Sequence, residues 1–193
     1  MVILLLIQYF LISRKLCKLL VVNTQLTVYK VFEKLGNIVS KVGSPLAQII
    51  YPEMNRHIAK RDFDKAKKLN DKLFKGIMML GGVLLIFVTL TYRFWLGYFI
   101  PDYDGYVITM LLYFVFMIYI NATVGVHSLF LALNYIKYNI PILLSVNVVY
   151  LIVLWVSIRK TGIFGVILSL LLQAIAVVVV KVIIMKKRGY KEI

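Results

Sequence analysis

The chain has 193 residues, of which 62% are hydrophobic and only 16% are charged, and its net charge is +15. A soluble domain is nearer to half apolar and a quarter charged, and a chain of this size has no interior that can hide the surplus. The composition excludes a soluble enzyme, a disulfide-stabilised scaffold and a disordered chain, and it predicts a helical membrane protein.

The first 22 residues contain a weak candidate span. An apolar run is followed, rather than preceded, by Arg14, Lys15 and Lys18. A signal peptide carries its positive charges before the apolar run. We therefore interpret residues 1–22 as a weak or truncated first transmembrane helix, with the single cysteine, Cys17, as a small apolar filler.

The next segment, residues 28–51, is strongly amphipathic. At 100° per residue its polar side chains fall within an arc of roughly 80°. The side chains in this arc are Lys30, Lys34, Asn37, Lys41, Ser44 and Gln48. Glu33 lies beside the arc, and the opposite face is apolar, comprising Val28, Val31, Phe32, Leu35, Val39, Val42, Leu46 and Ile49.

Two placements fit this polar stripe. A helix that spans the membrane turns such a stripe toward a protein interior or a water-filled cavity, because lysines facing acyl chains are costly. A basic amphipathic helix can also lie flat on the membrane surface. We favour the spanning helix, since the stripe is narrow and Pro52 then opens a strongly basic segment.

Residues 53–75 form a predicted cytoplasmic connector. Ala59, Phe63, Ala66 and Leu73 fall on one helical face, which indicates a short helix lying along the inner membrane surface. A nucleic-acid partner is a poor interpretation of the basic residues, because no binding motif accompanies them. Anionic lipid headgroups are the expected partner.

Four long apolar segments follow, over residues 76–96, 106–133, 140–158 and 166–185. Each is long enough to cross a bilayer, which takes about 20 residues as a helix. Their lack of period-two alternation excludes a transmembrane barrel. The expected fold is all-α, with about six transmembrane helices and a tail over residues 186–193.

The distribution of charge predicts the orientation. When the connecting segments are assigned to alternate sides, one side carries residues 53–75, Lys137 and the C-terminal basic cluster, in which we include Lys181. The other side carries only Arg93, Arg159 and Lys160. Because cytoplasmic loops are rich in Lys and Arg, residues 53–75 and the C-terminus are predicted to be cytoplasmic.

Catalytic and metal-binding patterns are weak in this sequence. It has no Gly-rich phosphate-binding loop, and His57 and His127 have no further ligand at a metal-binding spacing. No cofactor and no enzymatic activity are expected. Asn121 and His127 lie inside a predicted span and are candidate functional groups, although hydrogen bonding between helices is the more frequent role of such residues.

Four segments together resemble a known family: Tyr29–Leu35 (YKVFEKL), Pro45–Glu53 (PLAQIIYPE), Arg61–Leu69 (RDFDKAKKL) and Lys160–Gly165 (KTGIFG). In their order and spacing they resemble the second half of bacterial O-antigen and exopolysaccharide repeat-unit flippases. These transporters belong to the MATE-like multidrug/oligosaccharidyl-lipid/polysaccharide superfamily. The resemblance extends from about Val28 to the end of the chain.

The resemblance implies a fold of two pseudo-symmetric lobes, of which this chain corresponds to the second. A partner N-terminal lobe is therefore expected, and the chain is a fragment, a split-gene partner or a self-assembling half. The implied activity is transfer of undecaprenyl-diphosphate-linked oligosaccharide across the cytoplasmic membrane.

Within this interpretation the lysines of residues 28–51 attract the anionic diphosphate, Asn37 and Gln48 bind sugar hydroxyls, and Glu33 is a candidate for ion coupling. Two alternatives stay open. One is cation-coupled multidrug efflux by a relative of the same superfamily, and the other is a membrane subunit or remnant that transports nothing.

Overall fold

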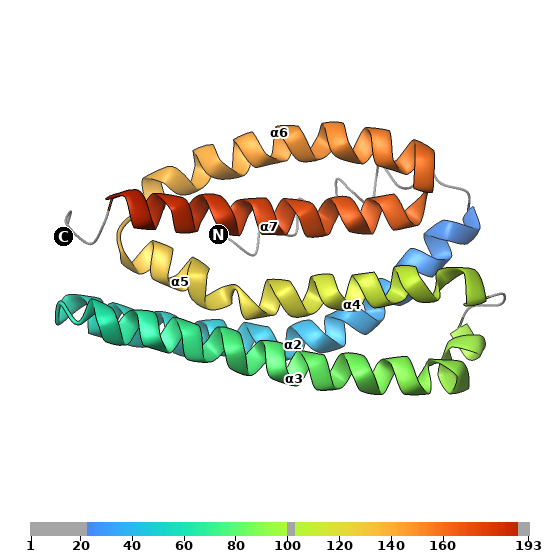
Figure 1. Cartoon of the computed structure of the whole chain (residues 1–193), viewed down its shortest axis with the longest axis horizontal. Helices are drawn as coiled ribbons and strands as arrows, with labels where there is room; N and C mark the ends of the chain where they lie inside the picture. The colour runs from blue at the N-terminus through green and yellow to red at the C-terminus, as the bar shows by residue number, and fades with distance from the viewer. Residues whose placement is uncertain (1–22, 100–102, 189–193) are drawn as a thin grey trace.

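The computed structural model describes residues 23–99 and 103–188, and these ranges contain helices and no strand. The all-helical prediction is confirmed for this part of the chain (Figure 1). The predicted first span, residues 1–22, and the end of the tail, residues 189–193, lie outside the described residues. The elements are α2 (Asn23–Ala59), α3 (Phe63–Phe99), a short 3-10 helix η1 (Tyr103–Tyr106), α4 (Val107–Ala122), α5 (Val124–Ala132), α6 (Ile136–Thr161) and α7 (Ile163–Arg188).

Among the described residues, four helical stretches are long and apolar enough to cross a membrane: Phe63–Phe94 of α3, Val107–Ala132 over α4 and α5, Ile136–Thr161 of α6 and Ile163–Lys187 of α7. These correspond to the four apolar segments of the sequence. Helix α2, which carries Lys30, Glu33, Lys34 and Lys41, is not one of them. The helices are those of a membrane-embedded protein, and a total of six spans stays a prediction.

The helices form three approximate layers (Figure 1). Helices α6 and α7 run antiparallel in one layer, α4 and α5 follow one another in the middle, and α2 and α3 form the opposite layer. The α2–α3 turn, the α5–α6 connection and the C-terminal end of α7 gather at one end of the bundle. The start of α4 and the α6–α7 turn lie at the other end. The segments rich in Lys and Arg therefore share one end of the bundle, as expected when successive loops lie on alternate sides.

Helices α2 and α3 extend further than the sequence suggested. Pro52 was expected to end the first of them, yet α2 continues through Pro45 and Pro52 to Ala59. Each proline removes one N–H donor and bends a helix without necessarily ending it, and α2 is visibly bent (Figure 1). At 37 residues each, α2 and α3 are about 55 Å long, against about 30 Å for the hydrocarbon core.

Residues 53–75 therefore form no separate surface helix. They are the facing ends of α2 and α3, joined by the turn at Lys60–Asp62. Phe63, Ala66 and Leu73 do share a face, but it packs into a protein core around α5 rather than onto lipid, and Ala59 is exposed. Three of the four residues assigned to one apolar face do share that face. The face packs against another helix.

The turn between α2 and α3 has a defined backbone structure. Arg61 is left-handed (φ 56°), and the backbone N–H groups of Arg61 and Asp62 donate to the carbonyls of Ile58 and His57. This is the Schellman arrangement that closes a helix C-terminus. The Asp62 carboxylate then caps α3, because its Oδ1 accepts the backbone N–H of Lys65 at 3.3 Å. The side-chain hydrogen bond from the Lys65 ammonium group, whose Nζ is 2.6 Å from Oδ2, lowers the pKa of Asp62.

The predicted span 106–133 is interrupted. It consists of α4 and α5 with Thr123 between them (φ −87°, ψ 2°), and α5 turns out of the line of α4 toward α7 (Figure 1). The Thr123 hydroxyl donates to the carbonyls of Tyr119 and Ile120, at 3.1 and 3.0 Å. This hydroxyl satisfies carbonyl groups at the interruption, where Ser and Thr side chains can replace backbone partners inside a membrane.

Two apolar clusters hold the bundle together. The cluster nearer the start of α4 surrounds Tyr113 and joins α2, α3, α4, α6 and α7. The cluster nearer the basic end surrounds Met54 and Phe130, both 0% exposed, and joins the ends of α2 and α3 to α5 and α6. Between α6 and α7 the chain reverses at Gly162, whose φ of 58° and ψ of −132° are open only to glycine.

Candidate functional site

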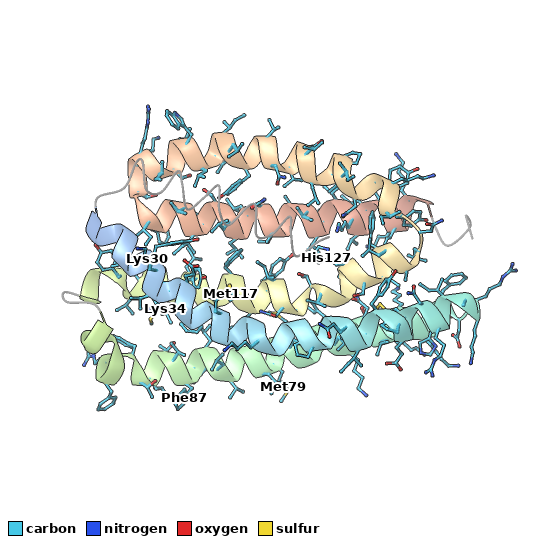
Figure 2. All side chains as sticks on the ribbon, turned by 180° about the vertical axis from the view of Figure 1, so that it is seen from behind. Lys30, Lys34, Met79, Phe87, Met117 and His127 are labelled. Carbon is cyan, nitrogen blue, oxygen red and sulfur yellow. The ribbon has the colours of Figure 1, made fainter. Side chains whose placement is uncertain are left out.

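The polar residues of α2 lie on an exposed face of the bundle. Every one of them whose side chain is described is solvent-exposed, namely Lys30, Lys34, Asn37, Lys41 and Gln48. Ser44 lies on the same helix, and its side chain is outside the described set. Figure 2 labels Lys30 and Lys34 on the N-terminal half of α2. These six residues, five of them with described and exposed side chains, are called here the α2 polar face.

The other side of α2 is anchored to α4. Val28, Tyr29 and Phe32 are at most 2% exposed. The rings of Tyr29 and Phe32 contact that of Tyr113, with centroids 6.5 and 6.1 Å apart. Such aromatic pairs are worth about 0.5–1.5 kcal/mol beyond their burial. This packing fixes the rotation of the N-terminal half of α2 and thereby turns Lys30 and Lys34 outward.

The predicted apolar face fails at one described position. Ile49 was assigned to it but is 66% exposed, while Ile50, Met54 and Ile58 are buried. The buried face itself continues past Pro45, because Ile50 comes 18 residues, or five full turns, after the buried Phe32. Ile49 lies at the edge of this face, at the same wheel angle as the half-buried Val31.

Glu33 stays close to the α2 polar face without being part of it. Its side chain is half-buried, and its carboxylate acts electrostatically on the phenol of Tyr113. It therefore faces α4 rather than the open side of α2.

The two polar candidates in α4 and α5 have separate roles. Asn121 is buried, and its Nδ2 donates to the Met117 carbonyl of its own helix at 2.7 Å. His127 contacts a different helix: its Nδ1 is 2.9 Å from Nζ of Lys181 on α7. Figure 2 shows His127 on the α5 side of the space between α5 and α7. Neither residue joins the exposed α2 polar face.

Lys181 is the residue that sequence reasoning misplaced. It was counted with the basic C-terminal cluster, but it is 2% exposed and lies inside α7. Its Nζ also lies 5.1 Å from the centroid of the Phe130 ring, a distance typical of a cation–π contact. The signal was present, because a single lysine interrupts the apolar run Val177–Ile184, but its partner is 54 residues away in the sequence.

A third polar contact ties α6 to α7. Nε2 of Gln173 donates to Oδ1 of Asn147 at 2.9 Å. Both side chains are half-buried within apolar helices. A hydrogen bond between spanning helices of this kind is a structural tie, and it lies apart from both the α2 polar face and the His127–Lys181 pair.

Comparison of the chain with protein-family models, with curated proteins and with solved structures finds no match.

Proposed function

We propose that this chain forms one lobe of a flippase that moves a lipid-diphosphate-linked oligosaccharide across the cytoplasmic membrane. The observation that carries the proposal is the asymmetry of α2, whose lysines are exposed while Tyr29 and Phe32 on the opposite side are buried. The resemblance of the sequence to polysaccharide repeat-unit flippases supplies the class of substrate.

An exposed cationic face within a membrane needs a polar environment. Each lysine at the centre of a bilayer costs roughly 2.5–3.5 kcal/mol when it faces lipid. Helix α2 contacts α3, α4 and α5 on its other sides, so Lys30, Lys34 and Lys41 face away from the described bundle. A water-filled cavity shared with a second lobe provides the environment that these side chains require.

The chemistry of the face suits a diphosphate with attached sugars. Lysine ammonium groups attract phosphate strongly when water is partly excluded, and the amides of Asn37 and Gln48 can donate to and accept from sugar hydroxyls. From Lys30 to Gln48 the helix rises about 27 Å, which is close to the thickness of the hydrocarbon core. The polar path is therefore long enough to guide a headgroup from one leaflet to the other.

Transport then follows from movement of two lobes around a shared cavity. The partner of this lobe is a separate N-terminal lobe or a second copy of the chain, placed against the α2 polar face. Rocking of one lobe against the other exposes the cavity to each side of the membrane in turn. The same arrangement explains why the lysines are exposed in the isolated lobe.

Binding of the lipid diphosphate tests the proposal directly. The full chain, in nanodiscs of zwitterionic lipid, is titrated with undecaprenyl diphosphate, and bound lipid is counted by native mass spectrometry. The triple variant Lys30→Gln, Lys34→Gln, Lys41→Gln is expected to weaken binding by at least about tenfold, since each lost charge contact with phosphate is worth about 1.5–3 kcal/mol. The control replaces three exposed lysines of α3, Lys67, Lys68 and Lys72, by Gln. It therefore has the same net charge as the α2 triple variant.

Unchanged binding in the α2 variant sinks the proposal. An equal loss in both variants shows that general positive charge, and not the α2 polar face, attracts the lipid. The environment of the face is tested separately with Cys17→Ser as background. A single cysteine at Asn37 or Lys41 should react with a membrane-impermeant thiol reagent, while one at the buried Phe32 should not. Protection at Asn37 and Lys41 would favour a sealed interface and a subunit that transports nothing.

A further inference from the structure

The pair formed by His127 and Lys181 is a second polar site, separate from the α2 polar face. Lys181 is one of the largest fully buried side chains of the described chain, and its Nζ is 2.9 Å from Nδ1 of His127. Within residues 23–99 and 103–188, no carboxylate forms an ion pair with Lys181. A buried lysine in a spanning helix without an acidic partner is rare and marks a functional candidate.

The chemistry of the two groups requires that one of them is a base. An ammonium group carries three donors and no acceptor, whereas a neutral imidazole has one nitrogen that accepts. A charge-assisted bond between Nζ and Nδ1 forms when Lys181 is protonated and Nδ1 is not, or when the proton has moved to the ring. In both of these forms the pair carries one positive charge, whereas a neutral amine and a neutral ring share a weaker bond. A second proton would place two positive charges 2.9 Å apart, and their repulsion disfavours it.

The charged group in direct contact with His127 is Lys181. Other charges lie one residue further away, namely Asp71, which accepts a hydrogen bond from Asn70, and Lys137, over the ring of Tyr138. The helices packed around α5 at this level present apolar side chains, and the titratable groups among them are the phenols of Tyr135 and Tyr138. Asn70 of α3 faces Gly125 with a neutral amide. Further out, at the α2–α3 turn, lie the half-buried His57 and the ion pair of Glu53 with Arg56.

The pair lies near the basic end of the bundle and bridges two helices. Lys181 lies about two turns from the end of α7, roughly 10 Å along the helix axis, at the basic end of the bundle (Figure 1). With the C-terminus at the cytoplasmic surface, as the charge distribution predicts, this is the distance that separates the pair from the aqueous phase. His127 lies on α5, which turns toward α7 after the interruption at Thr123. The bond between the two side chains is thus a polar tie between α5 and α7.

We propose that His127 and Lys181 form a proton-binding site that holds one exchangeable proton between α5 and α7. Loss of this proton converts a charge-assisted hydrogen bond into a neutral one, which is about half as strong, and loosens the tie between the two helices. In one respect the inference rests on the proposed function: in a transporter, this pair is the point at which a proton gradient acts on the lobe, in place of Glu33.

Nuclear magnetic resonance of the histidine rings tests the site without any transport assay. The chain has two histidines, so His57→Gln leaves one ¹⁵N-labelled imidazole in the full chain in lipid bilayers. We expect Nδ1 of His127 to resonate as an unprotonated, hydrogen-bonded nitrogen and to shift in one step between about pH 5 and pH 11, a range that covers the ordinary pKa values of His and Lys.

Two further variants distinguish proton binding by the pair from its role in helix packing. Lys181→Met keeps an unbranched apolar stem and should abolish the step and move the Nδ1 resonance. His127→Gln keeps an acceptor for Lys181 but binds no proton. An Nδ1 resonance that is the same in Lys181→Met and in its parent overturns the proposal, and so does the absence of any step in the unaltered pair over this pH range.

Proton uptake by vesicles holding the full chain and its partner lobe then tests coupling. We expect lipid-dependent uptake by the unaltered chain and its loss in His127→Gln. If the ring titrates with Lys181 but His127→Gln takes up protons as the unaltered chain does, the role in coupling is overturned while the site stands. If neither chain binds undecaprenyl diphosphate, the proposed function fails and the resonance experiment still decides on the proton site.

Discussion

Gly81 of α3 lies directly against Ile118 of α4. A Cβ atom built on Gly81 would collide with Cγ2 of Ile118 and would lie 2.8 Å from its Cγ1. The absence of a side chain therefore lets the two helices approach closely, as small residues do at helix interfaces within membranes. The next residue, Gly82, has nothing within 4 Å of such an atom. Substitution of Gly82 is therefore a control for substitution of Gly81.

Gly81→Ala should therefore destabilise the fold, while Gly82→Ala should not. Overpacking of a close interface costs about 1–3 kcal/mol, whereas an alanine in an open helical position gains roughly 0.5–1 kcal/mol over glycine. The free energy of unfolding, measured by denaturation with SDS in mixed micelles and followed by circular dichroism, should fall for the first variant and stay level or rise for the second. Equal effects of the two variants would contradict the packing of α3 on α4.

The hydrogen bond between Gln173 and Asn147 should give a measurable coupling energy. Bonds of this kind between spanning helices average about 0.6 kcal/mol and reach about 1.7 kcal/mol in double-mutant cycles. Gln173→Leu, Asn147→Leu and the double variant, unfolded under the same conditions, should show coupling in this range. A coupling energy near zero would mean that the two side chains do not share a bond at the α6–α7 interface. Thr91→Val combined with Gln173→Leu provides a control for additivity, since Thr91 donates to Phe87 within α3.

The cap at the start of α3 should make stability depend on pH. The pKa of Asp62 is lowered from its ordinary value in the folded chain, chiefly by the side-chain hydrogen bond from the Lys65 ammonium group. The charged carboxylate thus stabilises the fold above the unfolded-state pKa, and this contribution is lost as the pH falls through the lower, folded-state pKa. Asp62→Asn retains an oxygen that can accept the Lys65 N–H but removes the charge.

The difference in unfolding free energy between the wild type and Asp62→Asn should therefore be constant above about pH 5 and should shrink below about pH 4. The exposed Asp64, whose replacement by Asn changes the net charge equally, provides the control. A difference that persists at low pH would place the effect elsewhere than in the ionised carboxylate. Circular dichroism in a detergent that is uncharged over this range is the appropriate measurement.

Cysteines that replace charged residues at the two ends of the bundle should react with a membrane-impermeant thiol reagent from opposite sides of the membrane. In the Cys17→Ser background, cysteines at Lys68 and Lys187 are expected to react in inverted vesicles but not in intact cells, because the basic end is predicted to be cytoplasmic. A cysteine at Arg159, at the other end, should react in intact cells. Reaction of Lys68 and Lys187 variants from opposite sides would contradict the shared end seen in Figure 1.

The sequence alone was sufficient to predict the class of fold and the positions on α2 that are polar. Long apolar runs have to be buried in lipid or protein, so the four apolar helices were predictable from composition and length. The polar positions of α2 were also predictable, because a 3.6-residue period brings Lys30, Lys34, Asn37 and Lys41 to one side of any helix. These properties depend on neighbours in the sequence, and periodicity reports them directly.

What the tertiary structure decided depends on contacts between distant segments. The sequence did not show that α2 passes Pro52 as one helix, that Phe63 and Ala66 pack on protein, or that Ile49 at the edge of the apolar face is exposed. Nor did it pair Lys181 with His127, because no local pattern distinguishes a lysine near a helix end in water from one bonded across a helix interface. Local periodicity fixes which side chains share a face, but only packing decides what that face meets.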